Sequence, residues 1–98
     1  MKIRVSGRAQ RDADRHDAWW RANRPAAPDL LIRELLQVLE LLEGNPNLGA
    51  LYDATHFEGP VRRLLMRKTE RHVYFGHLDN ELVVLANWGA RRARGPKL

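Results

Sequence analysis

The chain has no cysteine, which excludes disulfide frameworks, thiolate zinc sites and cysteine nucleophiles. It also lacks a long hydrophobic run, because charged and polar residues interrupt its most apolar stretch, Leu30 to Leu42. A bilayer span needs roughly 20 apolar residues. Residues 1–6 show no hydrophobic segment of the kind found in signal peptides. We therefore expect a cytoplasmic protein with no membrane contact.

Glycine and proline are also scarce, at seven and five among 98 residues, while 44% of the chain is apolar. This composition favours one folded domain over residues 1–98 and argues against a disordered chain. A domain of this size buries about 60–70% of its unfolded surface. That leaves no room for a large cofactor-binding domain, so we expect no cofactor and a partner that meets a surface or a shallow groove.

The net charge of +5 is distributed unevenly. Residues 1–59 carry eight Lys or Arg and nine Asp or Glu, whereas residues 60–98 carry nine and three. Clustered cations attract and orient polyanions. The second half therefore points to an acidic partner, either a nucleic acid or an acidic protein segment.

Apolar periodicity predicts a strand followed by two helices in the first half. Residues 2–5 alternate polar and apolar side chains, and Ser6-Gly7 ends this strand. Residues 8–23 repeat apolar side chains every three or four positions and stop before Pro25, which indicates an amphipathic helix. A second helix starts at Pro28 and stops at Gly44, with apolar residues on two of its sides.

The second half reads as strands. We expect a loop over residues 48–60, strands over 61–66, 72–78 and 81–88, and an irregular tail over 89–98. Asp79-Asn80 fits a two-residue hairpin turn that tolerates positive φ. The order predicts an α+β fold: an N-terminal strand, a two-helix hairpin on one face, and a three-stranded antiparallel meander. The opposite face would then carry many of the arginines of the second half.

Several segments, in this order and spacing, resemble the RelE/ParE superfamily of toxins from type II toxin–antitoxin systems, also called plasmid stabilisation proteins. They are the Trp19-Trp20 helix, the turn over residues 45–49, Gly59-Pro60-Val61-Arg62-Arg63-Leu64, Arg71-His72-Val73-Tyr74-Phe75, and Trp88-Gly89-Ala90-Arg91-Arg92 with Pro96. The resemblance covers most of the chain. It implies a small sheet with a helical hairpin on one face, as the periodicity predicts.

The same resemblance implies a growth inhibitor that a cognate antitoxin neutralises by wrapping a flexible segment around it. Two branches of the superfamily differ in target. ParE-like members are described as poisons of DNA gyrase, whereas RelE-like members cleave messenger RNA in the ribosome. We expect a ParE-like, noncatalytic inhibitor that binds gyrase, with the endoribonuclease as the alternative.

This choice depends on which chemical groups the chain offers. Metal-independent RNA cleavage needs a base, an acid and cations that stabilise the charged phosphorane. RelE-like members typically have a tyrosine or similar group near the carboxyl end and a lysine-rich stretch, and both are missing here. If the chain is a ribonuclease, Arg63, Arg71 and Arg91 are the catalytic candidates. His56, His72 and His77 are acid or base candidates, but no carboxylate is spaced to pair with them, and no metal cluster is expected.

Aromatic and basic side chains are the candidates for binding. Trp19 and Trp20 point about 100° apart on one helix, so one neighbour cannot bury both equally, and one can await a partner. Tyr74 and Phe75 should point to opposite faces of their strand, one of them away from the core. The residues expected to contact the target or the antitoxin are Arg62, Arg63, Arg71, Tyr74, Arg91, Arg92, Trp19 and Trp20.

Overall fold

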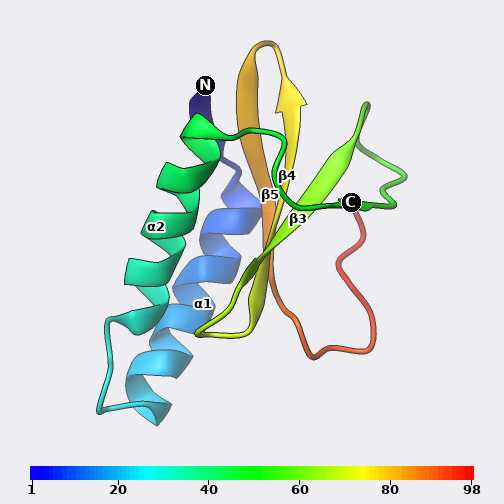
Figure 1. Cartoon of the computed structure of the whole chain (residues 1–98). Helices are drawn as coiled ribbons and strands as arrows, with labels where there is room; N and C mark the ends of the chain where they lie inside the picture. The colour runs from blue at the N-terminus through cyan, green and yellow to red at the C-terminus, as the bar shows by residue number, and fades with distance from the viewer.

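The computed structural model describes residues 1–98 as two helices packed on one face of a five-stranded sheet (Figure 1). Along the chain the elements are β1 (Lys2–Val5), α1 (Gly7–Asn23), α2 (Leu30–Gly44), β2 (Ala50–Tyr52), β3 (Val61–Met66), β4 (Arg71–Leu78) and β5 (Glu81–Gly89). The strand order is β1-β5-β4-β3-β2. Strand β1 runs parallel to β5, and the other pairs are antiparallel. The predicted α+β fold is confirmed, including the meander over β3, β4 and β5.

Local sequence signals account for the ends of the helices. The hydroxyl of Ser6 accepts a hydrogen bond from the Ala9 N–H at 3.1 Å, so Ser6 caps α1. Helix α1 ends at Asn23, two residues before Pro25, as predicted. Helix α2 begins at Leu30, two residues after the predicted start. The two helices form the predicted hairpin.

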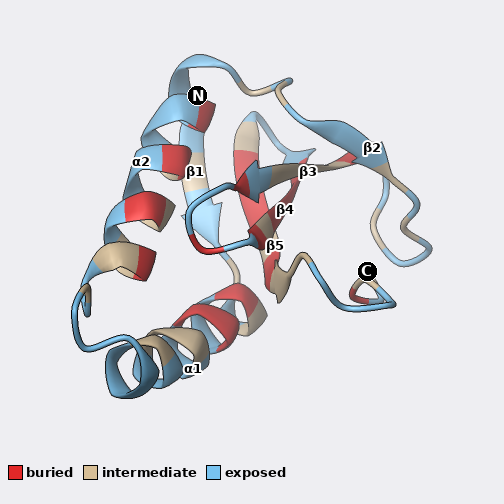
Figure 2. Ribbon diagram, turned by 60° about the horizontal axis from the view of Figure 1, so that its bottom comes forward, coloured by how far each residue is buried: buried red, intermediate tan, exposed pale blue.

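The core lies between the helices and the sheet. Figure 2 shows buried residues on the inward sides of both helices and along the central strands. Ala9 from α1 and Val38 and Leu42 from α2 meet apolar side chains of β3, β4 and β5: Met66, Val73, Phe75, Leu82 and Val84. Burying this apolar surface is the main favourable contribution to folding.

The β4–β5 hairpin has the predicted turn. Asp79 and Asn80 have φ values of 50° and 64°. Two consecutive positive φ values are typical of the turns whose twist matches that of the flanking strands. The long β4–β5 pairing then places the end of β5 close to α1, against which β5 packs.

The prediction of a loop throughout residues 48–60 was wrong, because Ala50–Tyr52 forms β2 against β3. Gly49 precedes it with φ of 90°, and a side chain there would collide with the carbonyl of Arg63. This close approach lets a short strand start in a segment of mixed polarity. The pairing extends the sheet by one edge strand.

The tail over residues 90–98 is irregular, as predicted, but it is held against the sheet. In Figure 1 the tail, in orange and red, leaves β5 and returns on the side opposite the helices. The Tyr52 hydroxyl donates to the Pro96 carbonyl at 2.7 Å, and the His56 N–H donates to the Leu98 carbonyl at 2.7 Å. Pro96 is buried by these contacts.

The expectation that either Tyr74 or Phe75 faces away from the core was half right. Phe75 joins the core under the helices, and Tyr74 projects from the opposite face, yet each is only 1% exposed. The rings of Tyr52 and His72 pack on Tyr74, with centroids 4.7 and 5.8 Å away. A bulge at Tyr74/Phe75 shifts the pairing with β5. The opposite face therefore has a small core of its own.

Candidate functional site

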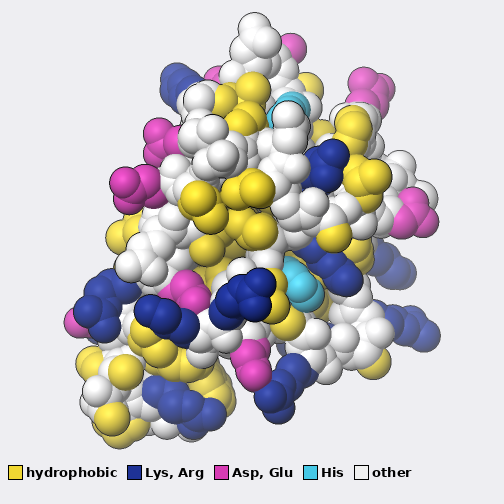
Figure 3. All heavy atoms as spheres, in the orientation of Figure 1, with side chains coloured by type: hydrophobic (Ala, Val, Ile, Leu, Met, Phe, Trp, Pro, Cys, Tyr) yellow, Lys and Arg dark blue, Asp and Glu magenta, His cyan; other side chains and the backbone are white.

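An open groove of about 490 Å³ lies where α1 ends, the β3–β4 turn projects and the chain leaves β5. Its walls are formed by Trp19, Trp20, Arg24, Lys68, Thr69, Glu70, Gly89, Arg91 and Arg92, and we call it the Trp–Arg groove. Four of these residues are cations and one is an acid. In Figure 3 most Lys and Arg side chains on the visible face gather in the lower half, where the link between the two helices and the β3–β4 turn lie. The groove therefore offers a positive surface.

Helix α1 supplies the aromatic wall. The indole N–H of Trp20 donates to the Ala27 carbonyl at 2.8 Å, which fixes this ring against the link between the helices. Trp19 has no such anchor and is 50% exposed. The guanidinium of Arg24 lies 5.2 Å from the Trp19 ring centre and 5.7 Å from that of Trp20. The two rings and this cation form one surface, stabilised by cation–π attraction.

The β3–β4 turn supplies the second wall, and a buried carboxylate holds it in place. Glu34 on α2 accepts hydrogen bonds from the Lys68 N–H at 2.7 Å, the Thr69 N–H at 2.9 Å and the Thr69 hydroxyl at 2.7 Å. Glu34 is only 7% exposed. These contacts attach the turn to α2, and so they position Lys68 and Glu70 at the groove.

The third wall follows β5 and contains an exposed ion pair. Arg91 contacts both carboxylate oxygens of Glu70: its Nε lies 2.7 Å from Oε2, and its Nη2 lies 2.8 Å from Oε1. Arg92 stacks instead on Trp88, 4.4 Å from the ring centre. The Trp88 indole donates to the Arg94 carbonyl at 2.9 Å, which fixes this ring. Arg91 and Arg92 are exposed, so both can meet a partner.

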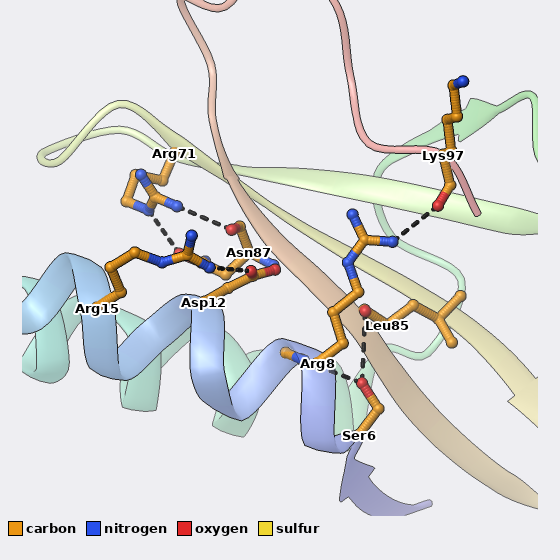
Figure 4. Close-up of polar contacts among 9 residues, drawn as sticks. Ser6, Arg8, Asp12, Arg15, Arg71, Leu85, Asn87 and Lys97 are labelled. Carbon is orange, nitrogen blue, oxygen red and sulfur yellow. Dashed lines mark hydrogen bonds and ion pairs between the residues drawn. The ribbon is translucent and has the colours of Figure 1, made fainter.

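Arg71 lies away from the groove surface in a buried polar network (Figure 4). Its guanidinium donates to the side-chain oxygen of Asn87 and, at 2.8 Å, to the Asn87 carbonyl. Asp12 accepts from the Asn87 N–H at 3.1 Å and from Arg15 at 3.1 Å. The network joins α1 to β4 and β5. The binding role expected for Arg71 stays a prediction, since the structure uses these donors internally.

Burial changes the pKa values in this network. Burial lowers the pKa of Arg71 to about 10, although the Asp12 carboxylate acts in the opposite direction. Burial, followed by the nearby charges of Arg71 and Arg15, lowers the pKa of His16 to about 4. The His16 imidazole is therefore neutral at neutral pH, which avoids a further positive charge beside Arg71.

The face of the sheet opposite the helices carries a different group of side chains. Strand alternation places Arg63, His72 and Tyr74 there, and the Arg63 guanidinium lies 5.7 Å from the Tyr52 ring centre. Burial and then Arg63 lower the pKa of His72. Burial raises the pKa of Tyr52, whose hydroxyl already donates to the tail. Because Tyr74 is buried, the half-buried Arg63 and His72 are the polar groups of this cluster that solvent can reach.

The expectation that many arginines of the second half share this face was wrong for the strands. Side chains alternate along a strand, so Arg62 and Arg71 lie on the helix side and only Arg63 lies opposite. Arg62 donates to the Gly49 carbonyl at 3.2 Å and borders a hollow of about 90 Å³ with His77, whose ring contacts the Pro46 carbonyl.

A separate apolar cleft of about 240 Å³ lies between the two helices and the β1 side of the sheet. Its lining is Val5, Ala9, Gln10, Ala13, Ile32, Leu35, Leu36, Leu39, Val84 and Asn87. Leu36 is 60% exposed at this cleft. Exposed apolar surface of this kind is available for burial against another protein.

The structure therefore divides the predicted binding residues. Trp19, Trp20, Arg91 and Arg92 meet in the Trp–Arg groove, whereas Arg62, Arg63, Arg71 and Tyr74 lie elsewhere. Sequence reasoning missed Arg24, Lys68 and Glu70. Their sequence signal was weak: Arg24 precedes a proline, and the other two lie in a turn between strands.

No group of three or more histidine or acidic side chains is arranged to hold a metal ion. Neither helix has the length and apolar character that a membrane span requires.

Comparisons with known proteins complete this description. No family model matches the sequence, and no curated protein matches it. Among solved structures, the fold is similar to that of a chain described as belonging to the chromosomal ParDE TA system from P. aeruginosa, with a TM-score of 0.73. The alignment covers 93% of this chain and 97% of that one, at 18% sequence identity. The likeness shows a shared fold over nearly the whole chain.

Proposed function

We propose that this chain is the toxin of a type II toxin–antitoxin pair, which arrests growth by binding DNA gyrase and is held inactive by its antitoxin. The observation that carries the proposal is the fold, which matches a chain of a ParDE system over 93% of the residues. The Trp–Arg groove and the apolar cleft support it, because a binding inhibitor needs accessible surfaces.

The geometry favours a binding inhibitor over a ribonuclease. On the face opposite the helices, His72 with its lowered pKa suits a general base, and Arg63 suits charge stabilisation. A proton donor for the leaving oxygen is lacking there, because Tyr74 is buried and the Tyr52 hydroxyl is engaged with the tail. The other two catalytic candidates do not lie beside them, because Arg71 is buried and Arg91 is paired with Glu70 in the Trp–Arg groove.

The test uses purified toxin with gyrase and relaxed plasmid. We expect supercoiling to be inhibited, or cleaved complexes to accumulate, and the antitoxin to reverse the effect. The antitoxin is to be sought in the neighbouring reading frame, as a short protein with an acidic, amphipathic carboxyl end. The double variant Arg91→Ala, Arg92→Ala should raise the inhibitory concentration without unfolding the protein, whereas the α2 surface variant Arg33→Ala should match the parent. Growth arrest with supercoiling untouched by saturating, folded toxin would exclude gyrase as the target.

A ribosome-dependent endoribonuclease is the second candidate, and the placement of His72 and Arg63 on the same face of the sheet is the observation that favours it. It predicts cuts in messenger RNA soon after induction, mapped by primer extension. Arg63→Ala should abolish such cuts at unchanged folding. Cuts with this dependence would replace gyrase binding as the mechanism and would leave the toxin assignment in place.

A further inference from the structure

We infer that the Trp–Arg groove is the docking site for an extended acidic segment of a partner protein. In the free chain Glu70 forms an ion pair with Arg91, and a carboxylate of the segment takes the place of Glu70 on binding. The antitoxin is the partner to which we assign the segment, so the inference rests on the proposed function. Its first basis is charge. The lining has cations on three separate elements, namely Arg24, Lys68 and the pair Arg91 and Arg92. A segment with several carboxylates would contact all three walls.

The aromatic wall defines the second requirement on the partner. Trp19 is 50% exposed beside Trp20, and Arg24 lies over both rings. Tryptophan and arginine together are enriched at the centres of protein interfaces, where an apolar side chain covers the ring and a carboxylate meets the guanidinium. The segment should therefore combine apolar and acidic residues rather than carry charge alone.

Glu70 behaves as an internal stand-in for the partner's carboxylate. Its two oxygens face two nitrogens of Arg91, the paired geometry that arginine adopts with any carboxylate. Both side chains are accessible, at 82% exposed for Arg91 and 51% for Glu70, so an incoming segment can reach the pair. An exposed ion pair contributes little stability, so replacing one carboxylate by another costs little free energy.

The backbone holds Glu70 in this position. Glu70 has a positive φ of 57°, which is unfavourable for a residue with a side chain. Its N–H donates to the Met66 carbonyl at 2.8 Å, and its carbonyl accepts from the Ala90 N–H at 2.9 Å. The first bond closes the turn onto β3, and the second links the turn to Ala90, the residue that precedes Arg91. Backbone strain maintained by surrounding contacts is frequent at binding sites.

The surroundings favour a protein segment over a nucleic acid strand. The helical hairpin that supplies the aromatic wall of the groove also carries Asp17 and Asp29, which pair with Arg21 at 3.0 and 2.8 Å. A phosphate backbone that continued past the groove would meet these acidic groups, whereas a short acidic segment can end before them. Polyanions prefer a continuous basic track.

The test measures binding of fluorescently labelled probes to the full chain by anisotropy. The probes are a peptide that repeats Asp-Leu-Glu, its neutral counterpart that repeats Asn-Leu-Gln, and single-stranded oligothymidine. Of the three probes we expect only the acidic peptide to bind, with an affinity that falls as the salt concentration increases. Arg91→Glu and Trp19→Ala should each weaken binding at least fivefold, whereas Arg33→Glu, an equal charge change on the exposed surface of α2, should weaken it less than twofold.

Glu70→Gln is the decisive variant, because it frees Arg91 while adding no new contact. It should bind the acidic peptide about two- to fivefold more tightly, the range expected from loss of a competing surface ion pair. Glu43→Gln, which removes an exposed carboxylate far from the groove, serves as its control and should have a smaller effect. Unchanged or weaker binding by folded Glu70→Gln would overturn the role of Glu70.

The remaining outcomes separate the two proposals. Oligothymidine bound more tightly than the peptide, and lost in the same variants, would overturn the protein partner in favour of a nucleic acid. Equal binding of the neutral peptide would refute the requirement for carboxylates. Peptide binding with this variant pattern, in a chain that does not arrest growth, would support the docking site while refuting the toxin assignment.

Discussion

Removal of the buried Glu34 carboxylate on α2 should destabilise the protein strongly. This carboxylate accepts three hydrogen bonds of 2.7–2.9 Å, from the Lys68 N–H, the Thr69 N–H and the Thr69 hydroxyl. A hydrogen bond to a charged group contributes about 1.5–3 kcal/mol. Thr69 is only 8% exposed, so its two donors would lose their partner without gaining water, whereas the Lys68 N–H lies nearer to solvent.

We therefore expect Glu34→Ala to lower the free energy of unfolding by about 3–5 kcal/mol, and Glu34→Gln, which keeps one acceptor, by roughly 1–2 kcal/mol. For a domain of this length the alanine variant should melt roughly 15 °C lower or more. Urea unfolding followed by circular dichroism gives the free energies, with Glu40→Ala, an exposed position on the same helix, as the control within about 0.5 kcal/mol.

A double-mutant cycle tests the cause of this loss. Thr69→Val removes the hydroxyl with little change in shape, so Glu34→Ala combined with Thr69→Val should cost less than the two single changes together. The Glu34→Gln variant should also bind the acidic peptide more weakly, because the turn that carries Lys68 and Glu70 is held less firmly. A loss in Glu34→Ala no greater than that in Glu40→Ala would refute the idea that this carboxylate fixes the turn.

Three further predictions concern other parts of the molecule. The pKa of His16 is about 4 in the folded state and 6.5 in its reference state, so between these pH values the unfolded chain binds one more proton than the folded chain. Stability should therefore fall as pH decreases from 6.5 towards 4. Urea unfolding should show a smaller fall in stability for His16→Gln. Tyr52→Phe removes the hydrogen bond to Pro96 and should cost about 1 kcal/mol, with faster amide exchange at residues 97 and 98 than in the parent; unchanged exchange would show that this bond does not hold the tail. Asn80, with φ of 64°, should tolerate glycine, whereas Asn80→Ala should lower stability by about 1 kcal/mol in thermal melts, and equal melting of the two variants would contradict the turn geometry.

Local patterns were sufficient to predict most elements of this fold. The apolar period and Pro25 predicted the extent of α1, and Asp79-Asn80 predicted the β4–β5 turn. These features depend on neighbours within a few residues, such as a proline that blocks a helix or side chains that tolerate positive φ. Sequence alone was enough for them. Strand β2 was missed because its residues pair only where Gly49 lets the chain approach β3.

The candidate site depended far more on tertiary structure. The charge of the second half predicted a basic surface for an acidic partner, but it did not show which arginines remain accessible to that partner. Arg71 and Arg91 look alike in sequence, yet Arg71 is buried against Asn87 and Arg91 is exposed beside Glu70. Their difference arises from strand pairing and helix packing, which bring together residues far apart in the chain. Sequence determined the residue types and the elements, and tertiary structure decided which of those residues form one groove.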